Sequence, residues 1–484
     1  MSGIISEGYR IGRAAAWALL CLGLVASVTD VRAEDRPNVL LIISDDLRDT
    51  VGCYGNAEVK TPNIDRLAAR GVRFDRAYVQ YPVCNPSRAS FLTGMRPEQT
   101  GVVDNTTPFR KPLPAVVTLP QALRHNGWQT VSYGKVFHTG APQPEVPGGW
   151  MDTEKSWNEA RMFPTTPVGE VSLEGRNLTE GKLDWCEWGA MAGTDDDQPD
   201  GQVALHSIQS IDRLTSEGKP WFISAGFHRP HDPFVAPKKY FELYDLESLT
   251  LYRNPADATP LSPLSIEGGH YTGAFDQFTD RDRLEFLRAY YASVSFMDAQ
   301  VGRLMETLDR LQLWDNTIVI FMGDHGYHLN ERDWWNKNTL FERGCRTPLI
   351  VAVPDALKGA TCAGLVEMVD LYPTLLDYCS VEPPHKMAGQ SLRPLLRNPA
   401  SPGRDAAYTF VSRHPHYGQT VRTDRWRFIQ WSDGHTELYD HQHDPQEMHD
   451  VSSRPKHASL IRELSAMLKK HGFKGTGFKG TGPS

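Results

Sequence analysis

Residues 84–94 have the sequence CNPSRASFLTG, the most informative stretch of this chain. A proline is well tolerated in the first turn of a helix, where its missing N–H group is not needed. Pro86 therefore predicts a helix that begins near Cys84, and Gly94 predicts its end, because glycine commonly follows the last helical residue. The positive end of the helix dipole favours an anion beside Cys84. A cysteine two residues before a proline and four before an arginine is an unusual choice for a purely structural helix.

The composition limits the classes of protein to which the chain can belong. Its 484 residues, 40% hydrophobic and 23% charged, suffice for one large core or two domains of an ordinary globular protein. The 51 basic and 59 acidic residues give a formal net charge of −8. This balance argues against a nucleic-acid partner, since nucleic-acid-binding domains are usually basic. It leaves room for a local basic pocket that takes an anionic substrate.

Residues 1–33 have the pattern of a secretory signal. Arg10 and Arg13 precede an apolar run over 14–28, and Ala33 ends a small-residue cleavage site. The run is short for a transmembrane span, although an uncleaved N-terminal anchor is the alternative. No second long apolar stretch follows, so we predict a secreted or periplasmic protein with no membrane partner after signal removal. On a eukaryotic secretory or lysosomal route, Asn105 and Asn177 would be glycosylation acceptors.

The cysteines do not form a dense disulfide framework. Of the seven, Cys21 lies in the predicted signal and Cys84 in the 84–94 motif. The remaining five are an odd number, so at least one stays unpaired, and their pairing is left open: Cys53, Cys186, Cys345, Cys362 and Cys379. No C-x-x-C pair occurs, which leaves a zinc ribbon or a thioredoxin-like site unsupported.

Apolar, β-branched runs alternate with helical patterns over most of the chain. The runs lie at 38–44, 130–133, 221–225, 317–322 and 349–353, and the helical patterns at 61–70, 119–126, 203–217 and 284–311. This alternation predicts an α/β domain over 34–395, with a mostly parallel sheet flanked by helices. Residues 139–200, rich in Gly, Pro, Trp and Asp, predict long irregular excursions.

The composition changes near 394–404. Short β-like runs follow at 407–412, 418–422, 426–431 and 436–439, and an amphipathic helix at 458–470. They predict a smaller C-terminal subdomain over 396–472, built of an antiparallel sheet and a helix. Residues 473–484 repeat Phe-Lys-Gly-Thr-Gly and predict a disordered tail.

Polar residues follow three of the predicted strands directly. They are Asp45 and Asp46, Lys135 with His138, and Asp324 with His325. Ligand sites of open α/β sheets gather beyond the carboxyl ends of the strands, so we expect these residues to meet in one crevice. Adjacent carboxylates repel each other unless a positive charge lies between them, and calcium or magnesium accepts carboxylate oxygens. The alternative is a pair of acids that merely caps a strand end in solvent.

Several blocks of sequence resemble one family. Together with 84–94 these are 38–46, 132–138, 226–234, 323–348 and, more weakly, 439–447. The chain resembles the type I, formylglycine-dependent sulfatases of the alkaline-phosphatase-like superfamily, and within them most closely the iduronate-2-sulfatases. The runs Gly-Lys-Val-Phe-His at 134–138 and Phe-His-Arg-Pro-His at 227–231 favour the iduronate group.

The resemblance implies a calcium site and a modified cysteine. Its metal ligands would be Asp45, Asp46, Cys84, Asp324 and His325; many sulfatases have asparagine at this last position, and histidine is less natural for a hard cation. A separate maturation enzyme would convert Cys84 to formylglycine. One hydroxyl of the hydrated aldehyde would attack sulfur, and the second would let the aldehyde re-form as sulfate leaves.

The resemblance also implies roles for the surrounding side chains. Arg88 would polarise the nucleophile, Lys135 would hold it, and His138 would assist removal of its proton. His228 would protonate the leaving oxygen or donate a hydrogen bond to it, and Lys337 would grip the sulfate. Four further residues are weaker candidates for substrate contact: Arg229, His231, Arg332 and Arg343.

These inferences predict a sulfuric ester hydrolase that acts on a sulfated carbohydrate. The leading substrate is a 2-O-sulfated iduronate or other uronate, and another sulfated glycan is the first alternative. A phosphate or phosphonate monoester hydrolase of the same superfamily is the second. A non-enzymatic alternative is a sulfated-glycan binder in which Cys84 stays a thiol; a thiolate protease-like site has less support, because only single histidines accompany the cysteine.

Overall fold

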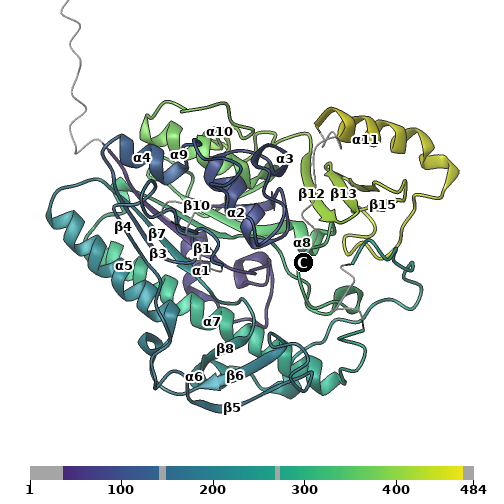
Figure 1. Ribbon diagram of the computed structural model, residues 1–484, viewed down its shortest axis with the longest axis horizontal. Coiled ribbons are helices and arrows are strands. Elements are labelled where there is room, and N and C mark those ends of the chain that lie inside the picture. Colours follow the sequence, from purple (N-terminus) through teal and green to yellow (C-terminus); the bar gives the residue numbers. More distant parts are fainter. Residues whose placement is uncertain (1–35, 141–148, 267–272, 472–484) are drawn as a thin grey trace, which may run out of the picture.

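The computed structural model describes residues 36–140, 149–266 and 273–471 (Figure 1). The predicted signal at 1–33 and the predicted tail at 473–484 lie outside the described residues. Among the helices of the described ranges, none combines the length and apolar character that crossing a membrane requires.

The centre of the protein is an eight-stranded sheet with the order β11-β2-β10-β9-β1-β7-β3-β4. Its strands are β1 (Asn38–Ser44), β2 (Val72–Tyr78), β3 (Gln129–Gly134), β4 (Glu159–Arg161), β7 (Trp221–Phe227), β9 (Thr317–Gly323), β10 (Arg346–Ala352) and β11 (Ala360–Glu367). Strands β9, β1, β7, β3 and β4 run parallel to one another, which confirms the predicted mostly parallel sheet. Strand β10 was expected to be parallel and is instead antiparallel to both β9 and β2.

Helices cover both faces of this sheet. On one face lie α1 (Pro62–Ala68), α5 (Pro199–Ser216) and α7 (Asp280–Arg310); on the other lie α2 (Cys84–Thr93), α4 (Leu119–His125), α9 (Leu371–Cys379) and α10 (Arg393–Arg397). Side chains of a strand alternate between faces. Leu40 and Ile42 of β1 therefore join the core under α5 and α7, while Leu41 and Ile43 join the core under α2 and α9.

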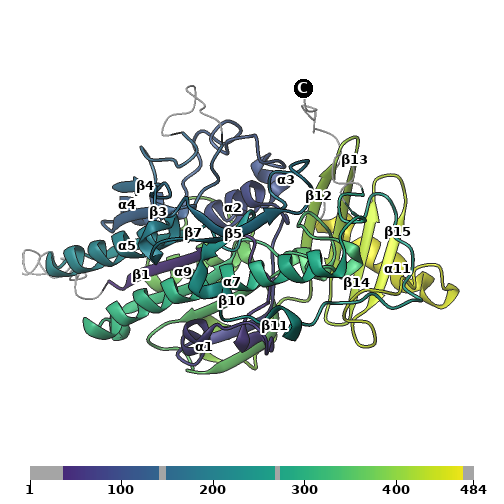
Figure 2. The same cartoon turned by 90° about the horizontal axis from the view of Figure 1, so that it is seen from below.

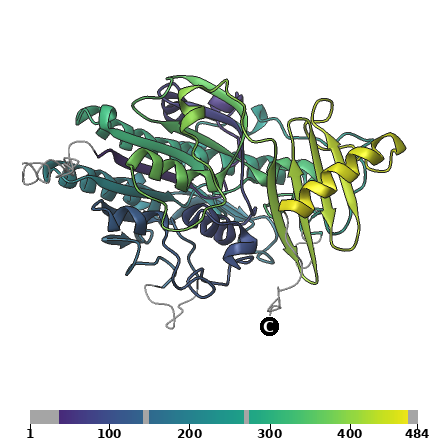
Figure 3. The same cartoon turned by 90° about the horizontal axis from the view of Figure 1, so that it is seen from above.

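A second sheet follows at the C-terminal end of the chain. Strands β12 (Ala407–Arg413), β13 (His416–Arg422), β14 (Trp426–Trp431) and β15 (Thr436–Asp440) pair in sequence as antiparallel neighbours. Helix α11 (Ala458–His471) packs Leu464 and Leu468 against Val421 and Phe428 of this sheet. Figures 2 and 3 show the sheet and α11 together at one end of the molecule.

The domain boundary predicted at 395/396 stays a prediction. Hydrogen bonds and an ion pair connect the two sides of this boundary. The Arg404 amide donates to the Leu365 carbonyl oxygen at 2.8 Å, and the Arg404 side chain forms an ion pair with Asp370.

The prediction of irregular structure over 139–200 is wrong for part of this range. Strand β4 joins the main sheet, and β5 (Ser172–Asn177) and β6 (Glu187–Met191) form a three-stranded sheet with β8 (Phe234–Pro237). Strand β5 is polar and exposed, so its sequence has no apolar alternation. The sheet owes its place to packing, because Trp188 and Phe234 share a buried cluster with Phe286 of α7. Short helices complete the fold: α3 (Pro97–Thr100), α6 (Lys238–Phe241) and α8 (Glu342–Cys345).

Candidate active site

The neighbouring strands β1 and β9 bring three acids together where both strands end. Asp45 and Asp46 follow β1, and Asp324 follows β9; all three side chains are fully buried. The Asp46 amide donates to Asp324 Oδ1 at 3.0 Å, and the φ angle of Asp46 is +62°, which turns the chain sharply after the strand. The predicted convergence of these residues is therefore observed.

Helix α2 places a buried arginine between these acids. Arg88 lies one turn after Cys84, so the two side chains share a face of the helix. Its guanidinium group lies 3.0 Å from Asp45 Oδ1 and 3.0 Å from Asp324 Oδ2. Burial opposes the charged form of Arg88, but Asp324 and Asp45 outweigh it and raise the pKa. Arg88 thus neutralises two acids that would otherwise repel each other.

Cys84 lies at the centre of the cluster and is fully buried. Its Sγ atom lies 3.2 Å from Lys337 Nζ, 3.3 Å from His325 Nε2 and 3.9 Å from Asp46 Oδ1. Burial and the charge of Asp45 raise the pKa of the Cys84 thiol. A cysteine that acts as a thiolate nucleophile needs the opposite shift, so these surroundings do not suit a protease-like thiolate.

Two lysines neutralise the remaining carboxylate charge. Lys135 Nζ forms an ion pair with Asp45 Oδ2, and Lys337 Nζ lies 2.6 Å from Asp46 Oδ1. Burial alone would lower the pKa values of both lysines. Asp45 outweighs this effect for Lys135 and Asp46 outweighs it for Lys337, so both pKa values are raised. Gly134 directs Lys135 inward: its φ angle is +73°, and a Cβ atom there would lie 2.1 Å from the carbonyl oxygen of Gly226.

Two histidines reach the acids from the loop after β7. His228 Nδ1 lies 3.8 Å from Asp45 Oδ2, His231 Nε2 lies 3.9 Å from Asp46 Oδ2, and the ring centroids are 4.8 Å apart. The exposed fractions of the His228, His231 and Lys337 side chains are 37%, 22% and 12%, whereas the acids beneath them are inaccessible. These three groups therefore form the solvent-facing layer of the cluster. Partial burial and the positive charge of Lys135 lower the pKa of His228.

His138 lies beside the cluster with its ring edge against Trp150, at a centroid separation of 5.5 Å. Burial, followed by the charge of Lys135, lowers the pKa of His138 to about 3. Its Nδ1 atom is buried and has no hydrogen-bond partner among the described residues. The ring is thus neutral.

The arginines predicted as substrate contacts have other partners here. Arg229 Nη1 donates to the carbonyl oxygens of His231 and Pro233, at 2.7 and 2.8 Å, and so braces its own loop. Arg332 Nη1 donates to the carbonyl oxygen of Thr259, and Arg343 Nη1 to Asp49. Their roles in substrate binding stay predictions.

Asp200 is a residue that the sequence did not single out. It is buried at the start of α5, and its two carboxylate oxygens accept the amide N–H groups of His228 and Arg229, each at 2.8 Å. An acid in the first turn of a helix is common, so nothing in the sequence distinguished this one. The two hydrogen bonds fix the backbone that carries His228.

The cluster has the donor groups of a metal site. One possible ligand atom from each of Asp45, Cys84, Asp324 and His325 lies within 4.8 Å of the others. The Asp46 Oδ2 atom is buried and has no hydrogen-bond partner among the residues described. Hard divalent cations prefer such carboxylate oxygens, whereas the imidazole of His325 is a softer ligand. These residues fit a calcium or magnesium ion.

Comparison with known proteins identifies the family of the chain. The model of the sulfatase family matches residues 37–381, and that of the C-terminal region of N-sulphoglucosamine sulphohydrolase matches 330–473. Human iduronate 2-sulfatase is 32% identical over 420 residues, which cover 78% of this chain and 76% of that protein.

Two solved structures share the fold. The phosphonate monoester hydrolase of Agrobacterium radiobacter has a TM-score of 0.76 at 23% identity and covers 90% of this chain and 95% of its own. A protein solved in complex with its substrate D-glucosamine-2-N,6-O-disulfate has a TM-score of 0.71 at 23% identity and covers 90% of this chain and 97% of its own. At such identities the likeness concerns the fold alone.

The fold and the cluster define an α/β protein with a buried acid site at the ends of its central strands. The chain belongs to the sulfatase family and is a sulfuric ester hydrolase.

Asp200→Asn should lower kcat/KM for an aryl sulfate at least tenfold, equivalent to about 1.4 kcal/mol of transition-state stabilisation. The side chain of asparagine carries an NH₂ group in place of one carboxylate oxygen, and this group cannot accept a hydrogen bond from a backbone N–H. One of the two hydrogen bonds from the His228 and Arg229 amides would therefore be lost, and His228 would be displaced. Steady-state kinetics measure the effect. Asp212→Asn is the matched control, because Asp212 lies on the same helix but pairs with Arg310 at the surface. Equal activity of the two variants would contradict the positioning role.

Proposed function

We propose that this sulfatase hydrolyses the sulfate monoesters of a sulfated sugar, using a formylglycine made from Cys84 and a calcium ion. The observation that carries the proposal is the position of Cys84 Sγ, within 3.3 Å of both Lys337 Nζ and His325 Nε2, at the start of α2. Carboxylates, a guanidinium group and two ammonium groups surround this atom. Such a setting suits a nucleophile that attacks an anionic ester.

The residues present fit both absent groups. Asp45, Asp46, Asp324 and His325, with residue 84, would hold the calcium ion, which would supply a divalent positive charge beside the sulfate oxygens. Formylglycine at position 84 would supply, as its hydrate, the oxygen nucleophile and the route by which sulfate is released. A maturation enzyme that converts Cys84 is therefore a proposed partner.

The side chains of the chain itself account for charge and proton movement. Hydrolysis breaks the bond between sulfur and the sugar oxygen and leaves negative charge on both products. Lys337, the cation nearest to solvent, would bind a sulfate oxygen, while Lys135 and Arg88 would hold the nucleophile in place. Charges fixed in this way before the reaction are the strongest means of stabilising a developing anion.

Two histidines would handle the protons. The half-exposed ring of His228 would donate a hydrogen bond or a proton to the sugar oxygen as it leaves, and Asp200 would keep that ring in position. The neutral ring of His138 would accept the proton of the nucleophile.

The substrate that we propose first is a 2-O-sulfated uronate. The support is the 32% identity with human iduronate 2-sulfatase, together with the runs at 134–138 and 227–231. Loops set the specificity of a fold of this kind, so another sulfated glycan is the alternative. Secretion or export to the periplasm, inferred from residues 1–33, stays a prediction.

A substrate panel tests the proposal. A disaccharide with a 2-O-sulfated uronate should release sulfate with a kcat/KM at least tenfold above a 6-O-sulfated disaccharide and an aryl phosphate or phosphonate. Ion chromatography of the released anion gives the rates. Cys84→Ala should stay folded and show no turnover, because residue 84 supplies the nucleophile. Preference for the phosphate or phosphonate ester, or near wild-type turnover by Cys84→Ala, would contradict the proposal.

Chelation tests the metal site. Removing calcium with a chelator should abolish sulfate release and lower the melting temperature by a few degrees, since an ion at one hundred times its Kd stabilises the native state by about 2.7 kcal/mol. Excess calcium should restore both properties. Asp46→Asn should lose the chelator-dependent change in melting temperature, while Asp212→Asn should keep it. A chelator that changes neither activity nor melting would argue against metal at these acids.

A further inference from the structure

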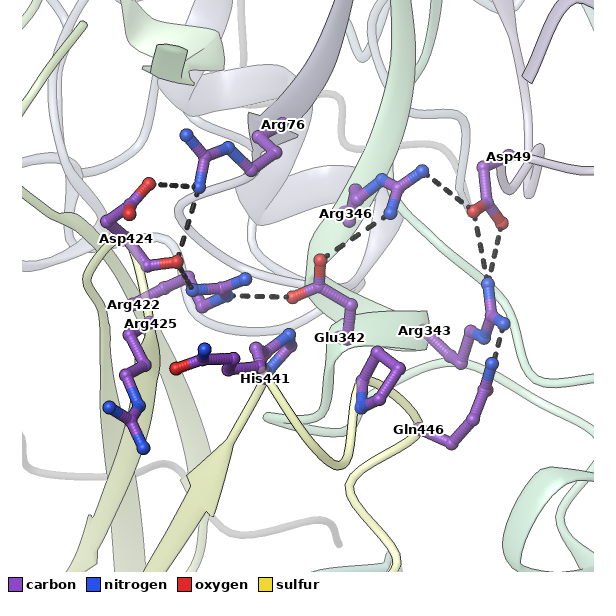
Figure 4. Close-up of a pocket in the computed structure, with 12 residues that line it drawn as sticks. Asp49, Arg76, Glu342, Arg343, Arg346, Arg422, Asp424, Arg425, His441 and Gln446 are labelled. Carbon is purple, nitrogen blue, oxygen red and sulfur yellow. Dashed lines mark hydrogen bonds and ion pairs between the residues drawn. The ribbon is translucent and has the colours of Figure 1, made fainter. Parts of the chain in front are cut away.

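A cavity of about 630 Å³ lies where the main sheet meets the C-terminal sheet (Figure 4). Its walls come from the loop after β1, from β2, from α8 and the start of β10, from the turn between β13 and β14, and from the loop after β15. The lining residues are Asp49, Arg76, Glu342, Arg343, Arg346, Arg422, Asp424, Arg425, His441, Gln442, Pro445 and Gln446. The cavity shares no residue with the Cys84 cluster.

The lining is basic in a protein whose net charge is −8. Five guanidinium groups face three carboxylates. Arg425 forms a bidentate pair with Asp440, which does not line the cavity, at 2.7 and 2.6 Å. Four guanidinium groups therefore remain for the three acids.

These acids are already shared among arginines. Asp49 lies 3.0 Å from Arg343 and 2.9 Å from Arg346, and Glu342 lies 3.3 Å from Arg422. Figure 4 shows these pairs as a continuous arc around the cavity. The acids hold the arginines in place without using all of their N–H groups.

Three arginines of the arc have N–H groups to spare. Arg76 donates from Nε to the carbonyl oxygen of Ala363 and from Nη1 to Asp424. Arg422 donates from Nε to Glu342 and from Nη1 to the carbonyl oxygens of Thr423 and Asp424. No residue in the described ranges accepts from Nη2 of either side chain. Arg346 Nη1 lies 3.7 Å from Glu342 Oε1, too far for a hydrogen bond, and has no other acceptor in the described part of the chain. A guanidinium group carries five N–H donors in a fixed fork, and that fork matches tetrahedral oxyanions.

We propose that this cavity binds a sulfate group through Arg76, Arg346 and Arg422, as a second site distinct from the catalytic cluster. Its volume falls within the range of small-molecule pockets and leaves room for a sugar that carries the sulfate. The choice of sulfate among oxyanions rests on the proposed function. The sulfate has two possible sources, the inorganic product and the ester group of a saccharide.

The cavity adjoins the catalytic cluster without sharing a residue with it. Asp49, which pairs with Arg346 at 2.9 Å, comes three residues after Asp46. Three residues of chain span at most about 11 Å.

Calorimetric titration of the full-length protein with inorganic sulfate tests the proposal. The wild type should bind sulfate at two classes of site, and Arg76→Gln should lose one of them. Asp424, the ion-pair partner of Arg76, is 86% exposed and can return to solvent when Arg76 is replaced, so this change should leave folding intact. The inhibition constant of sulfate against aryl sulfate hydrolysis should stay within twofold, because the catalytic cluster is untouched.

Arg425→Gln is the matched control, since it removes a cavity-lining guanidinium group whose charge is already paired with both carboxylate oxygens of Asp440, and it should keep both classes of site. If Arg76→Gln fails to fold, Arg76→Lys replaces it, which keeps the charge but lacks the fork. A single class of site in the wild type, or two classes in the Arg76 variant, would overturn the proposal.

The source of the sulfate is decided by a second titration, on Cys84→Ala protein, with a sulfated disaccharide and its desulfated counterpart. If the affinity for the sulfated disaccharide depends on Arg76 and is at least tenfold higher than that for inorganic sulfate, the cavity is a saccharide site. If the two affinities are equal, the cavity is a site for the free sulfate ion. Because heat and not turnover is measured, absence of sulfatase activity would refute the proposed function and leave this inference standing.

Discussion

Three buried carboxylates at the ends of two neighbouring strands are the constraint on which the rest of the structure depends. Asp45, Asp46 and Asp324 have no access to water, and like charges so close destabilise a fold unless cations compensate them. The compensation comes from three separate places: Arg88 on the helix after residue 83, Lys135 after β3 and Lys337 in the loop beyond β9. The order of the sheet brings these segments together, so fold and charge balance are linked.

The same charges explain why the site suits an anionic ester. Each cation is fixed by a carboxylate, and the carboxylates are fixed by the strands, so little rearrangement is needed when negative charge develops on sulfate and leaving oxygen. The least buried members, His228, His231 and Lys337, are those that a substrate would meet first. Burial thus sorts the cluster into an inner part that balances charge and an outer part that can contact the ester.

Sequence reasoning succeeded where polar residues directly follow fully apolar runs. That pattern predicted the central strands and the meeting of Asp45, Asp46 and Asp324. It missed β2, because the sequence Val-Arg-Phe-Asp-Arg-Ala-Tyr mixes charges into a half-buried strand, and β5, because packing and not composition makes it a strand. Lys337 and His228 lie in loops without a periodic pattern, so only family resemblance pointed to them. Asp200 stayed hidden because its role depends on a contact across 28 residues.

The central claim is that residue 84 becomes an aldehyde inside this cation-rich cluster. Mass spectrometry of the peptide that contains Cys84, from protein made in its native host, tests it most directly. The account predicts that the thiol mass is replaced by that of formylglycine. An intact thiol in protein that still hydrolyses sulfate esters would contradict it, because the buried, protonated Cys84 would then have to be bypassed by another nucleophile.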